Sequence, residues 1–274
     1  MMIPTLSLSN GVKMPAIGLG TYPLTGEDAV TAVQSALELG YRLIDTAENY
    51  GNEAAVGEAV RRSGLPRGEV FITSKFNRRW HSVAGVREAA AGSLERLGVE
   101  YIDLLLIHWP NPDQDRYVEA WQGLIELLDQ GVVRAIGTSN FKPAHLERII
   151  GATGVAPMVN QIQLSPWLGR TESVGYNQSH GILTEAWSPI KPASLLADPA
   201  IVAIAKELDA TPAQVVLRWH TQHGYLPIPK SASPVRQAEN LAIWEWTLSE
   251  EDMATLDGLN QGESAAADSD TFGH

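Results

Sequence analysis

The chain has 274 residues and a formal net charge of −12 at pH 7, with 44% hydrophobic residues and no cysteine. A sequence without cysteine excludes disulfides, thiolate catalysis and iron–sulfur clusters, and the acidic balance argues against nucleic acid or anionic lipid as a partner. No apolar run approaches the ~20 residues of a membrane span, and the N-terminus lacks a signal-peptide pattern, so we expect a soluble, cytoplasmic protein.

The first predicted element is a β-hairpin within residues 6–14, where Asn10–Gly11 between alternating runs predicts a type I′ turn. After the hairpin one pattern recurs: a short run rich in leucine and β-branched residues, a polar residue at its end, and an amphipathic helical segment. These runs are residues 16–20, 41–45, 70–75, 102–108, 132–140, 158–163, 181–187 and 225–230. Such runs are typical of strands that are covered on both faces, as in a parallel sheet.

Several helix starts are marked by their first residues. Residues 25–28, TGED, predict a capping box. Asp198–Pro199, Thr211–Pro212 and Ser233–Pro234 each pair an N-cap residue with proline at the first helical position.

Eight strand–helix units in one chain predict an α/β fold, a (β/α)8 TIM barrel that forms one domain over residues 1–274. We expect the N-terminal hairpin to close the barrel floor. The run at 225–230 contains two prolines, which disfavour an interior strand, so only the count of units supports a strand there. The polar segment 262–274 has no periodicity and predicts a mobile flap or a frayed end.

Polar side chains recur where the predicted strands end. In a parallel barrel these C-terminal ends open onto one face, and that face holds the active site. Each residue alone has an ordinary structural reading, such as a helix cap for Asp45 or a core histidine for His108. Their coincidence at one mouth favours a functional site. The residues at these ends are Gly20, Asp45, Lys75, His108, Ser139, Asn140, Gln161, Trp187 and Lys230.

Six segments carry a resemblance to a known family: RLIDTAENYGNE, VFITSK, DLLLIHWP, IGTSNF, VNQIQLSPW and IPKSASPVRQAEN. In order and spacing, across essentially the whole chain, they resemble the aldo-keto reductase family, especially its bacterial branch that includes 2,5-diketo-gluconate reductases. The resemblance implies NADPH-dependent reduction of an aldehyde or ketone, with a keto-sugar, an α-dicarbonyl or a small carbonyl compound as substrate. It also implies a monomer, and we expect no metal. The implied catalytic tetrad is Asp45, Tyr50, Lys75 and His108.

The chemistry of carbonyl reduction explains these residue types. The reaction needs a hydride at carbon and a proton at oxygen, and a free tyrosine with a pKa near ~10 holds its proton too tightly for an efficient acid. We expect Lys75 to lower the pKa of Tyr50 and Asp45 to keep the buried Lys75 charged. His108 is expected to donate a hydrogen bond to the carbonyl oxygen.

The resemblance also implies a cofactor and a substrate site. Trp187 would stack on the nicotinamide ring, and Lys230 with Arg236 suits the 2′-phosphate of NADP. The loop after Trp187, SPIKPASLL, replaces a glycine-rich loop that is common in relatives, and NQIQLSP at 160–166 also departs from their pattern. The implied NADP(H) contacts are Gly20, Thr21, Ser139, Asn140, Gln161, Trp187, Lys230, Ser231, Arg236, Glu239 and Asn240. The predicted substrate contacts are Tyr22, Trp80, His108 and Trp109.

The sequence allows three other interpretations. Residues 18–23, GLGTYP, imitate a dinucleotide-fold fingerprint, but Pro23 stands in place of the third glycine and six further strand units do not fit that fold. A non-catalytic NADPH-binding sensor on the same barrel would have no need of His108 as a donor. A barrel isomerase or lyase would have a sugar-phosphate site and no affinity for NADPH. The intact tetrad favours the reductase, and a turnover assay separates it from the sensor.

Overall fold

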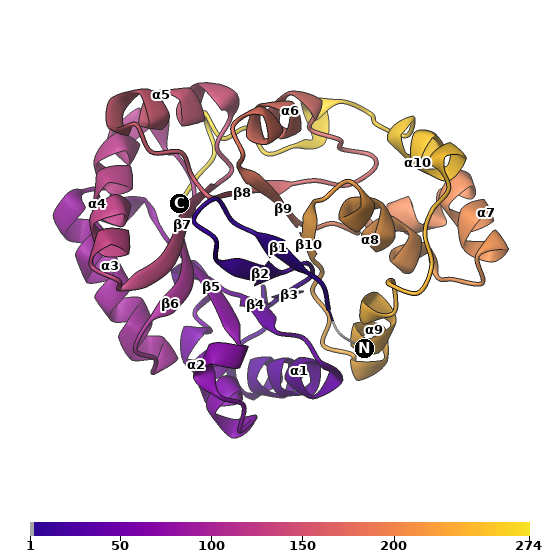
Figure 1. Ribbon diagram of the computed structural model, residues 1–274, viewed down its shortest axis with the longest axis horizontal. Coiled ribbons are helices and arrows are strands. Elements are labelled where there is room, and N and C mark those ends of the chain that lie inside the picture. The colour runs from indigo at the N-terminus through magenta and orange to yellow at the C-terminus, as the bar shows by residue number, and fades with distance from the viewer. Residues whose placement is uncertain (1–2) are drawn as a thin grey trace.

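The computed structural model describes residues 3–274 and forms a ring of parallel strands surrounded by helices (Figure 1). Eight strands are ordered β10-β9-β8-β7-β6-β5-β4-β3, so each strand pairs with its neighbour in sequence. Every predicted run overlaps one strand, which confirms the (β/α)8 barrel. The strands are β3 (Leu19–Gly20), β4 (Leu43–Asp45), β5 (Phe71–Phe76), β6 (Ile102–Ile107), β7 (Val133–Ser139), β8 (Val159–Gln163), β9 (Leu183–Trp187) and β10 (Leu226–Ile228).

Helices cover the outside of this ring. They are α1 (Gly26–Leu39), α2 (Glu53–Arg62), α3 (Val83–Leu97), α4 (Tyr117–Asp129), α5 (Pro143–Thr153), α6 (Thr171–Ser179), α7 (Pro199–Glu207), α8 (Pro212–Gln222), α9 (Pro234–Leu241) and α10 (Glu250–Asp257). Within residues 3–274, none of them combines the length and apolarity needed to cross a bilayer.

The predicted helix caps divide into three that form and one that does not. The side chains of Asp198, Thr211 and Ser233 each accept a hydrogen bond from a backbone N–H in the first turn of their helix. The capping box at residues 25–28 is wrong, because the Thr25 side chain makes no cap hydrogen bond. Gly26 has a φ of +53°, which departs from the helical geometry that a capping box requires.

The barrel closes between β3 and β10 through glycine and proline. Gly18 N donates to Pro227 O at 3.1 Å, and Gly20 N donates to Pro229 O at 3.2 Å. A Cβ on Gly20 would lie 2.8 Å from Ile228 O, so this close approach requires glycine. We call this joint the seam.

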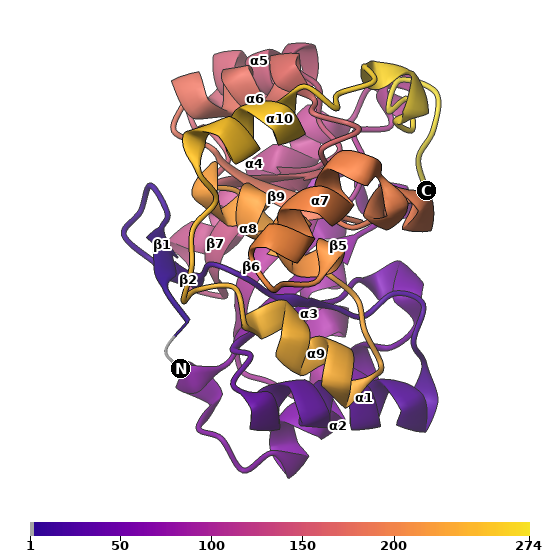
Figure 2. The same cartoon turned by 90° about the vertical axis from the view of Figure 1, so that its right-hand side faces the viewer.

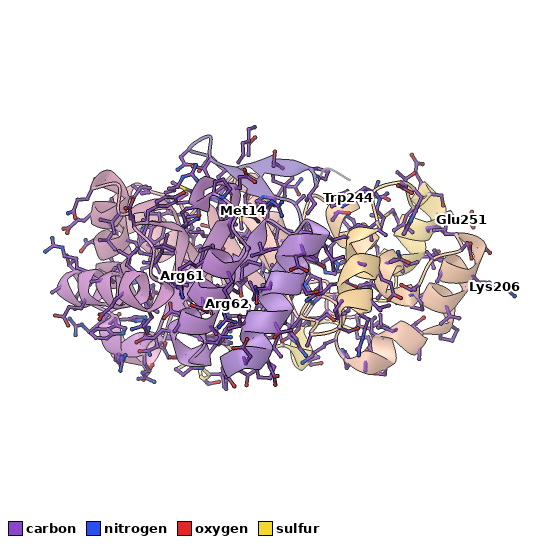
Figure 3. All side chains as sticks on the ribbon, turned by 90° about the horizontal axis from the view of Figure 1, so that it is seen from below. Met14, Arg61, Arg62, Lys206, Trp244 and Glu251 are labelled. Atoms are coloured by element: carbon purple, nitrogen blue, oxygen red, sulfur yellow. The ribbon has the colours of Figure 1, made fainter. Side chains whose placement is uncertain are left out.

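The N-terminal hairpin pairs β1 (Thr5–Ser7) with β2 (Lys13–Pro15) and lies at the end of the barrel where the strands begin. Asn10 Nδ2 donates to Arg134 O at 2.9 Å, and a cavity of 820 Å³ lies between the hairpin and the strand starts near Phe71. Met14 on β2 is fully buried (Figure 3). In Figure 2 the hairpin lies at the left and the C-terminus at the right, at opposite sides of the molecule.

The predicted type I′ turn of this hairpin is wrong. Gly11 has a φ of +86°, but Asn10 is not among the residues with positive φ, and a type I′ turn needs both. Gly11 N instead donates to Leu8 O at 2.9 Å, and Leu8 N donates to Val12 O. These bonds describe a three-residue loop that ends in a left-handed glycine.

The main core fills the space between the sheet and the helices α1 to α5. Leu43, Ile44 and Leu105 from the strands are fully buried in it, as is Trp121 from α4. A second cluster, which includes Trp219, lies where α7, α8 and α10 pack. Both cores leave the C-terminal strand ends free to carry polar groups.

Candidate active site

Lys75 is the centre of the polar cluster at the C-terminal end of the barrel. It lies on β5 and is fully buried. Its Nζ donates to Asp45 Oδ1 at 2.7 Å, to Thr46 O at 2.9 Å and to Tyr50 Oη at 3.3 Å. Asp45 ends β4, and Tyr50 follows in a short 3-10 turn, Glu48–Tyr50. An ammonium group has three protons to donate, so all three are used within this site.

The Lys75–Asp45 pair stays ionised in the interior. Burial by itself lowers the pKa of Lys75, but the Asp45 carboxylate and the Tyr50 hydroxyl raise it above its ordinary value. Burial raises the pKa of Asp45, and Lys75 opposes that change. Both Asp45 oxygens accept hydrogen bonds, one from Lys75 and one from Gln161 Nε2 at 2.8 Å, which is the pattern of a carboxylate.

The pKa of Tyr50 is set by burial and by the charges of Lys75 and Asp45. Burial raises it above the ordinary value of 10.0, Asp45 adds to the rise, and Lys75 lowers it by less than burial raises it. Lys75 therefore acts on Tyr50 in the expected direction, but burial outweighs it and the net pKa is raised. Tyr50 consequently keeps its proton at neutral pH.

His108 completes the cluster from the residue after β6. Its ring centroid lies 5.7 Å from that of Tyr50, and among residues 3–274 its buried Nδ1 has no hydrogen-bond partner. Burial, and then the positive charge of Lys75, holds the pKa of His108 well below 6.5. A neutral imidazole at this place can donate a hydrogen bond but does not carry a transferable extra proton.

The residues predicted to hold nicotinamide meet at the ends of β7, β8 and β9. Asn140 Nδ2 donates to His108 O at 3.1 Å, and Asn140 Oδ1 accepts from Trp187 Nε1 at 2.9 Å. Ser139 Oγ donates to Gln161 O at 3.0 Å. The amide of Gln161 reaches Asp45, so this group joins the tetrad directly.

The residues predicted for the other end of the cofactor lie after β10 and around the start of α9. Lys230 and Arg236 are exposed, and Arg236 is in the first turn of the helix that Ser233 caps. Ser231 Oγ accepts from Ser233 N at 3.1 Å. Glu239 and Asn240 follow on α9. Gly20 adjoins this region across the seam, since a Cβ built on it would meet the Lys230 side chain.

Thr21 differs from the other predicted cofactor residues. It is fully buried, and its hydroxyl donates to Asp45 O at 2.9 Å and accepts from Asn52 Nδ2 at 3.1 Å. Its side chain therefore supports the backbone of the tetrad strand rather than facing outward.

Aromatic side chains surround the approach to His108. Tyr22 is 61% exposed, and its ring centroid lies 5.1 Å from that of Tyr50. Trp80 Nε1 donates to Glu48 Oε2 at 2.9 Å, which fixes the indole at the rim. Trp109 is buried beside His108.

The C-terminal segment folds over this mouth. The Phe272 ring lies 4.9 Å from Trp109, and the His274 ring lies 4.8 Å from His108. Arg78 N donates to His274 O at 3.2 Å. The prediction for residues 262–274 left a flap and a frayed end open, and the structure has the flap. Lys142 Nζ also binds this segment, through Asp268 and Asp270.

One buried carboxyl group of the site could not be recognised from the sequence pattern. Glu185 lies on β9, is fully buried, and accepts a hydrogen bond from Gln161 Nε2 at 2.9 Å. The available signal was a carboxyl group inside the otherwise apolar run 181–187.

Comparisons with known proteins agree with this geometry. Residues 16–261 match the model of the aldo/keto reductase family. The chain is 44% identical over 270 residues to 2,5-diketo-D-gluconic acid reductase B of Corynebacterium sp., with 98% of each chain covered. It is 42% identical over 270 residues to methylglyoxal reductase DkgA of Escherichia coli K12, again with 98% of each covered. The crystal structure of a Gox0644 mutant in complex with NADPH superposes with a TM-score of 0.94 at 38% identity, with 99% of each chain covered.

Proposed function

Because this chain belongs to the aldo/keto reductase family and is an NADP-dependent oxidoreductase, we propose that it reduces an aldehyde or ketone to the alcohol, with Tyr50 as the proton donor. The observation that carries this proposal is the chain of contacts from Asp45 through Lys75 to Tyr50. These contacts connect the Tyr50 hydroxyl at the barrel mouth to the buried ammonium group of Lys75, which Asp45 holds in place.

Tyr50 is suited to proton donation in one direction. Its raised pKa keeps the proton on the phenol at neutral pH, and an alkoxide is a stronger base than a phenolate, so transfer to the product oxygen is favourable. Lys75 then faces the phenolate at 3.3 Å and stabilises it. His108, neutral and beside Tyr50, donates a hydrogen bond that orients the carbonyl oxygen.

The residues around the tetrad fit an NADP(H) nicotinamide. Gln161 uses its amide N–H groups on two carboxyl groups, and its Oε1 accepts no hydrogen bond from residues 3–274, so it is available to a carboxamide. Trp187 can present the face of its ring to the nicotinamide, because the hydrogen bond from its Nε1 to Asn140 Oδ1 fixes the indole. When bound, the cofactor supplies the hydride. We assign its 2′-phosphate to Lys230 and Arg236, which are exposed near the start of α9.

The substrate that we propose is an α-dicarbonyl or a keto-sugar. Two relatives carry the names 2,5-diketo-D-gluconic acid reductase and methylglyoxal reductase, each over nearly the full length of this chain. The aromatic wall of Tyr22, Trp80 and Trp109 selects such compounds by shape. We further propose that the protein works as one domain and as a monomer, which the family resemblance implies. We also propose that it is cytoplasmic and has no nucleic-acid partner, which its acidic, cysteine-free sequence favours.

Replacement of Tyr50 by phenylalanine tests the proposal. The ring remains and the donor is lost, so we expect kcat for methylglyoxal to fall by about 10²- to 10⁴-fold. The dissociation constant of NADPH should stay within about 3-fold, because the ring packing is retained. Loss of NADPH absorbance reports turnover. The matched control is Tyr101→Phe, since Tyr101 precedes β6 at the opposite end of the barrel. Wild-type turnover by Tyr50→Phe would remove Tyr50 as the acid.

A further inference from the structure

Glu185 is a second buried carboxyl group beside the tetrad, and the proposed mechanism does not use it. It lies on β9, directly opposite Gln161 on β8, and is fully buried. Its Oε2 accepts from Gln161 Nε2 at 2.9 Å, while the same nitrogen donates to Asp45 Oδ2 at 2.8 Å. One amide group therefore bridges two carboxyl groups, and Asp45 continues the chain to Lys75.

The charges around Glu185 favour its neutral form. The groups that face it are Asp45 from β4, Lys75 from β5 and Tyr50 from the turn after β4, while β10 contributes the apolar residues Leu226–Ile228. Lys75 is already matched by Asp45 at 2.7 Å, so an ionised Glu185 would add an unmatched negative charge. Its Oε1 is buried and meets no donor in the described part of the chain.

An anionic oxygen without a donor costs more in the interior than a neutral acid does. Burial, followed by the Asp45 carboxylate, raises the pKa of Glu185 to about 8. This direction agrees with the geometry.

The same arrangement decides which way the Gln161 amide faces. Both of its N–H bonds point at carboxyl oxygens, and the reversed amide would set its oxygen against Asp45 Oδ2 and Glu185 Oε2. Asp45 and Glu185 thus hold Gln161 Oε1 on the side away from the two carboxyl groups. On that side no residue within 3–274 donates a hydrogen bond to it. If either carboxyl group is removed, one N–H bond is released and the amide can turn.

We propose that Glu185 is a positioning residue, a neutral carboxylic acid that fixes the Gln161 amide so that its oxygen faces the nicotinamide carboxamide. Its neutral state also keeps the buried site at a single negative charge opposite Lys75. The contact between Gln161 and nicotinamide rests on the proposed function. The neutral state of Glu185 does not, so the two can be tested apart.

Stability against pH tests the neutral state without any turnover. Folded Glu185 keeps its proton at pH values where the unfolded chain has released it, so wild-type stability falls as the pH rises through this window. The amide side chain that Glu185→Gln introduces has no proton to release. Relative to wild type, the urea midpoint of this variant should therefore rise between about pH 5 and about pH 8 and level off above. Parallel midpoint curves for the two proteins would overturn the neutral acid.

The matched control for this measurement is Glu53→Gln. Glu53 is equally buried, but it accepts from Ser74 Oγ and from Arg96 Nε at 2.6 Å and does not contact the tetrad. Removal of its charge leaves the Arg96 guanidinium without its acidic partner, so this variant should be less stable than wild type at neutral pH. It should not reproduce the gain that we expect for Glu185→Gln with rising pH.

NADPH titration by tryptophan fluorescence tests the positioning role. Glu185→Gln keeps an acceptor for Gln161 and should bind NADPH within about 3-fold of wild type. Glu185→Met keeps the length but offers no acceptor, so its dissociation constant should rise by about 10-fold. Wild-type binding by Glu185→Met would overturn the role, and so would equal weakening in both variants. If no carbonyl compound is reduced by the wild-type protein, the proposed function fails while both of these measurements remain readable.

Discussion

Lys75 is a buried positive charge whose neighbours hold it in the ionised state. Its ammonium group is fully buried and depends on one carboxylate, one backbone carbonyl and one phenol. A buried ion pair of this kind contributes little net stability, but removal of one partner leaves the other charge unmatched. The pair therefore serves to hold a positive charge beside Tyr50. Its effect on the free energy of unfolding becomes large only when one of the two partners is removed.

Mutation of the pair tests this reading. Lys75→Met should lower the free energy of unfolding by about 3–5 kcal/mol, because Asp45 is left as a buried, unpaired carboxylate. Asp45→Asn combined with Lys75→Met should lose less than the sum of the single changes, since the double variant holds no unmatched charge. Urea unfolding at neutral pH measures all three. Strictly additive losses would mean that the two side chains do not stabilise each other.

The sequence identified the residues of the tetrad, but it could not predict the net direction of the Tyr50 pKa. Asp45, Lys75 and His108 could be picked out because each ends or follows a predicted strand of a barrel. The direction of the Tyr50 pKa could not, since it depends on how far burial outweighs Lys75 at 3.3 Å. Glu185 was missed because an apolar run predicts a strand without saying which of its side chains face the barrel interior.

In the proposed cofactor site, Arg236 on helix α9 would distinguish NADP from NAD. Arg236 is exposed in its first turn and has no acidic partner among the ion pairs of residues 3–274, so its guanidinium is available to a phosphate. Arg236→Ala should weaken NADP binding by about 10-fold and leave NAD nearly unchanged, because NAD has no 2′-phosphate. Fluorescence titration at low and high salt measures both constants. Lys206→Ala on α7 is the control cation (Figure 3), and equal wild-type affinity for NADP and NAD would refute the assignment.

The strand that the sequence supported least shows what pattern reasoning misses. Pro227 and Pro229 lack an N–H, yet both carbonyls accept at the seam, from Gly18 and Gly20. In a parallel strand the N–H and C=O of one residue point to the same side, so the prolines lose donors only toward the short strand β3. The flap over His108 was equally hidden, because its position rests on Lys142 binding Asp268 and Asp270, contacts between residues far apart in the chain.

The molecule as a whole should be sensitive to acid. His81 is buried, both of its ring nitrogens lack a partner within residues 3–274, and burial followed by the charge of Arg78 lowers its pKa to about 4. The pKa of His108 is lowered in the same direction. An unfolded histidine takes up a proton near pH ~6.5 while the folded one does not, so stability is lost as the pH falls below that value.

His81→Asn isolates one of these groups. Between about pH 7 and about pH 4, the free energy of unfolding of this variant should fall by roughly 2–3 kcal/mol less than that of the wild type. Urea titration at several pH values measures the slope. His180→Asn is the control, because His180 is exposed at the end of α6. Glu185 acts in the opposite sense, since it stabilises the fold as the pH falls, so the effects of Glu185 and His81 on stability oppose each other where their pH windows overlap. An unchanged slope in His81→Asn would show that His81 ionises freely in the folded protein.

The seam closes the barrel with few hydrogen bonds. β3 has two residues, and two hydrogen bonds from Gly18 and Gly20 close it against β10. Breathing motions of a folded protein begin where few bonds must break at once, so the ring should open first at this joint. Gly20 and Lys230 stand on its two sides, and both belong to the proposed cofactor site. A dinucleotide bound at the proposed site would hold the two sides of the seam together, so we expect the enzyme with cofactor to resist heat and proteolysis better than the enzyme without it.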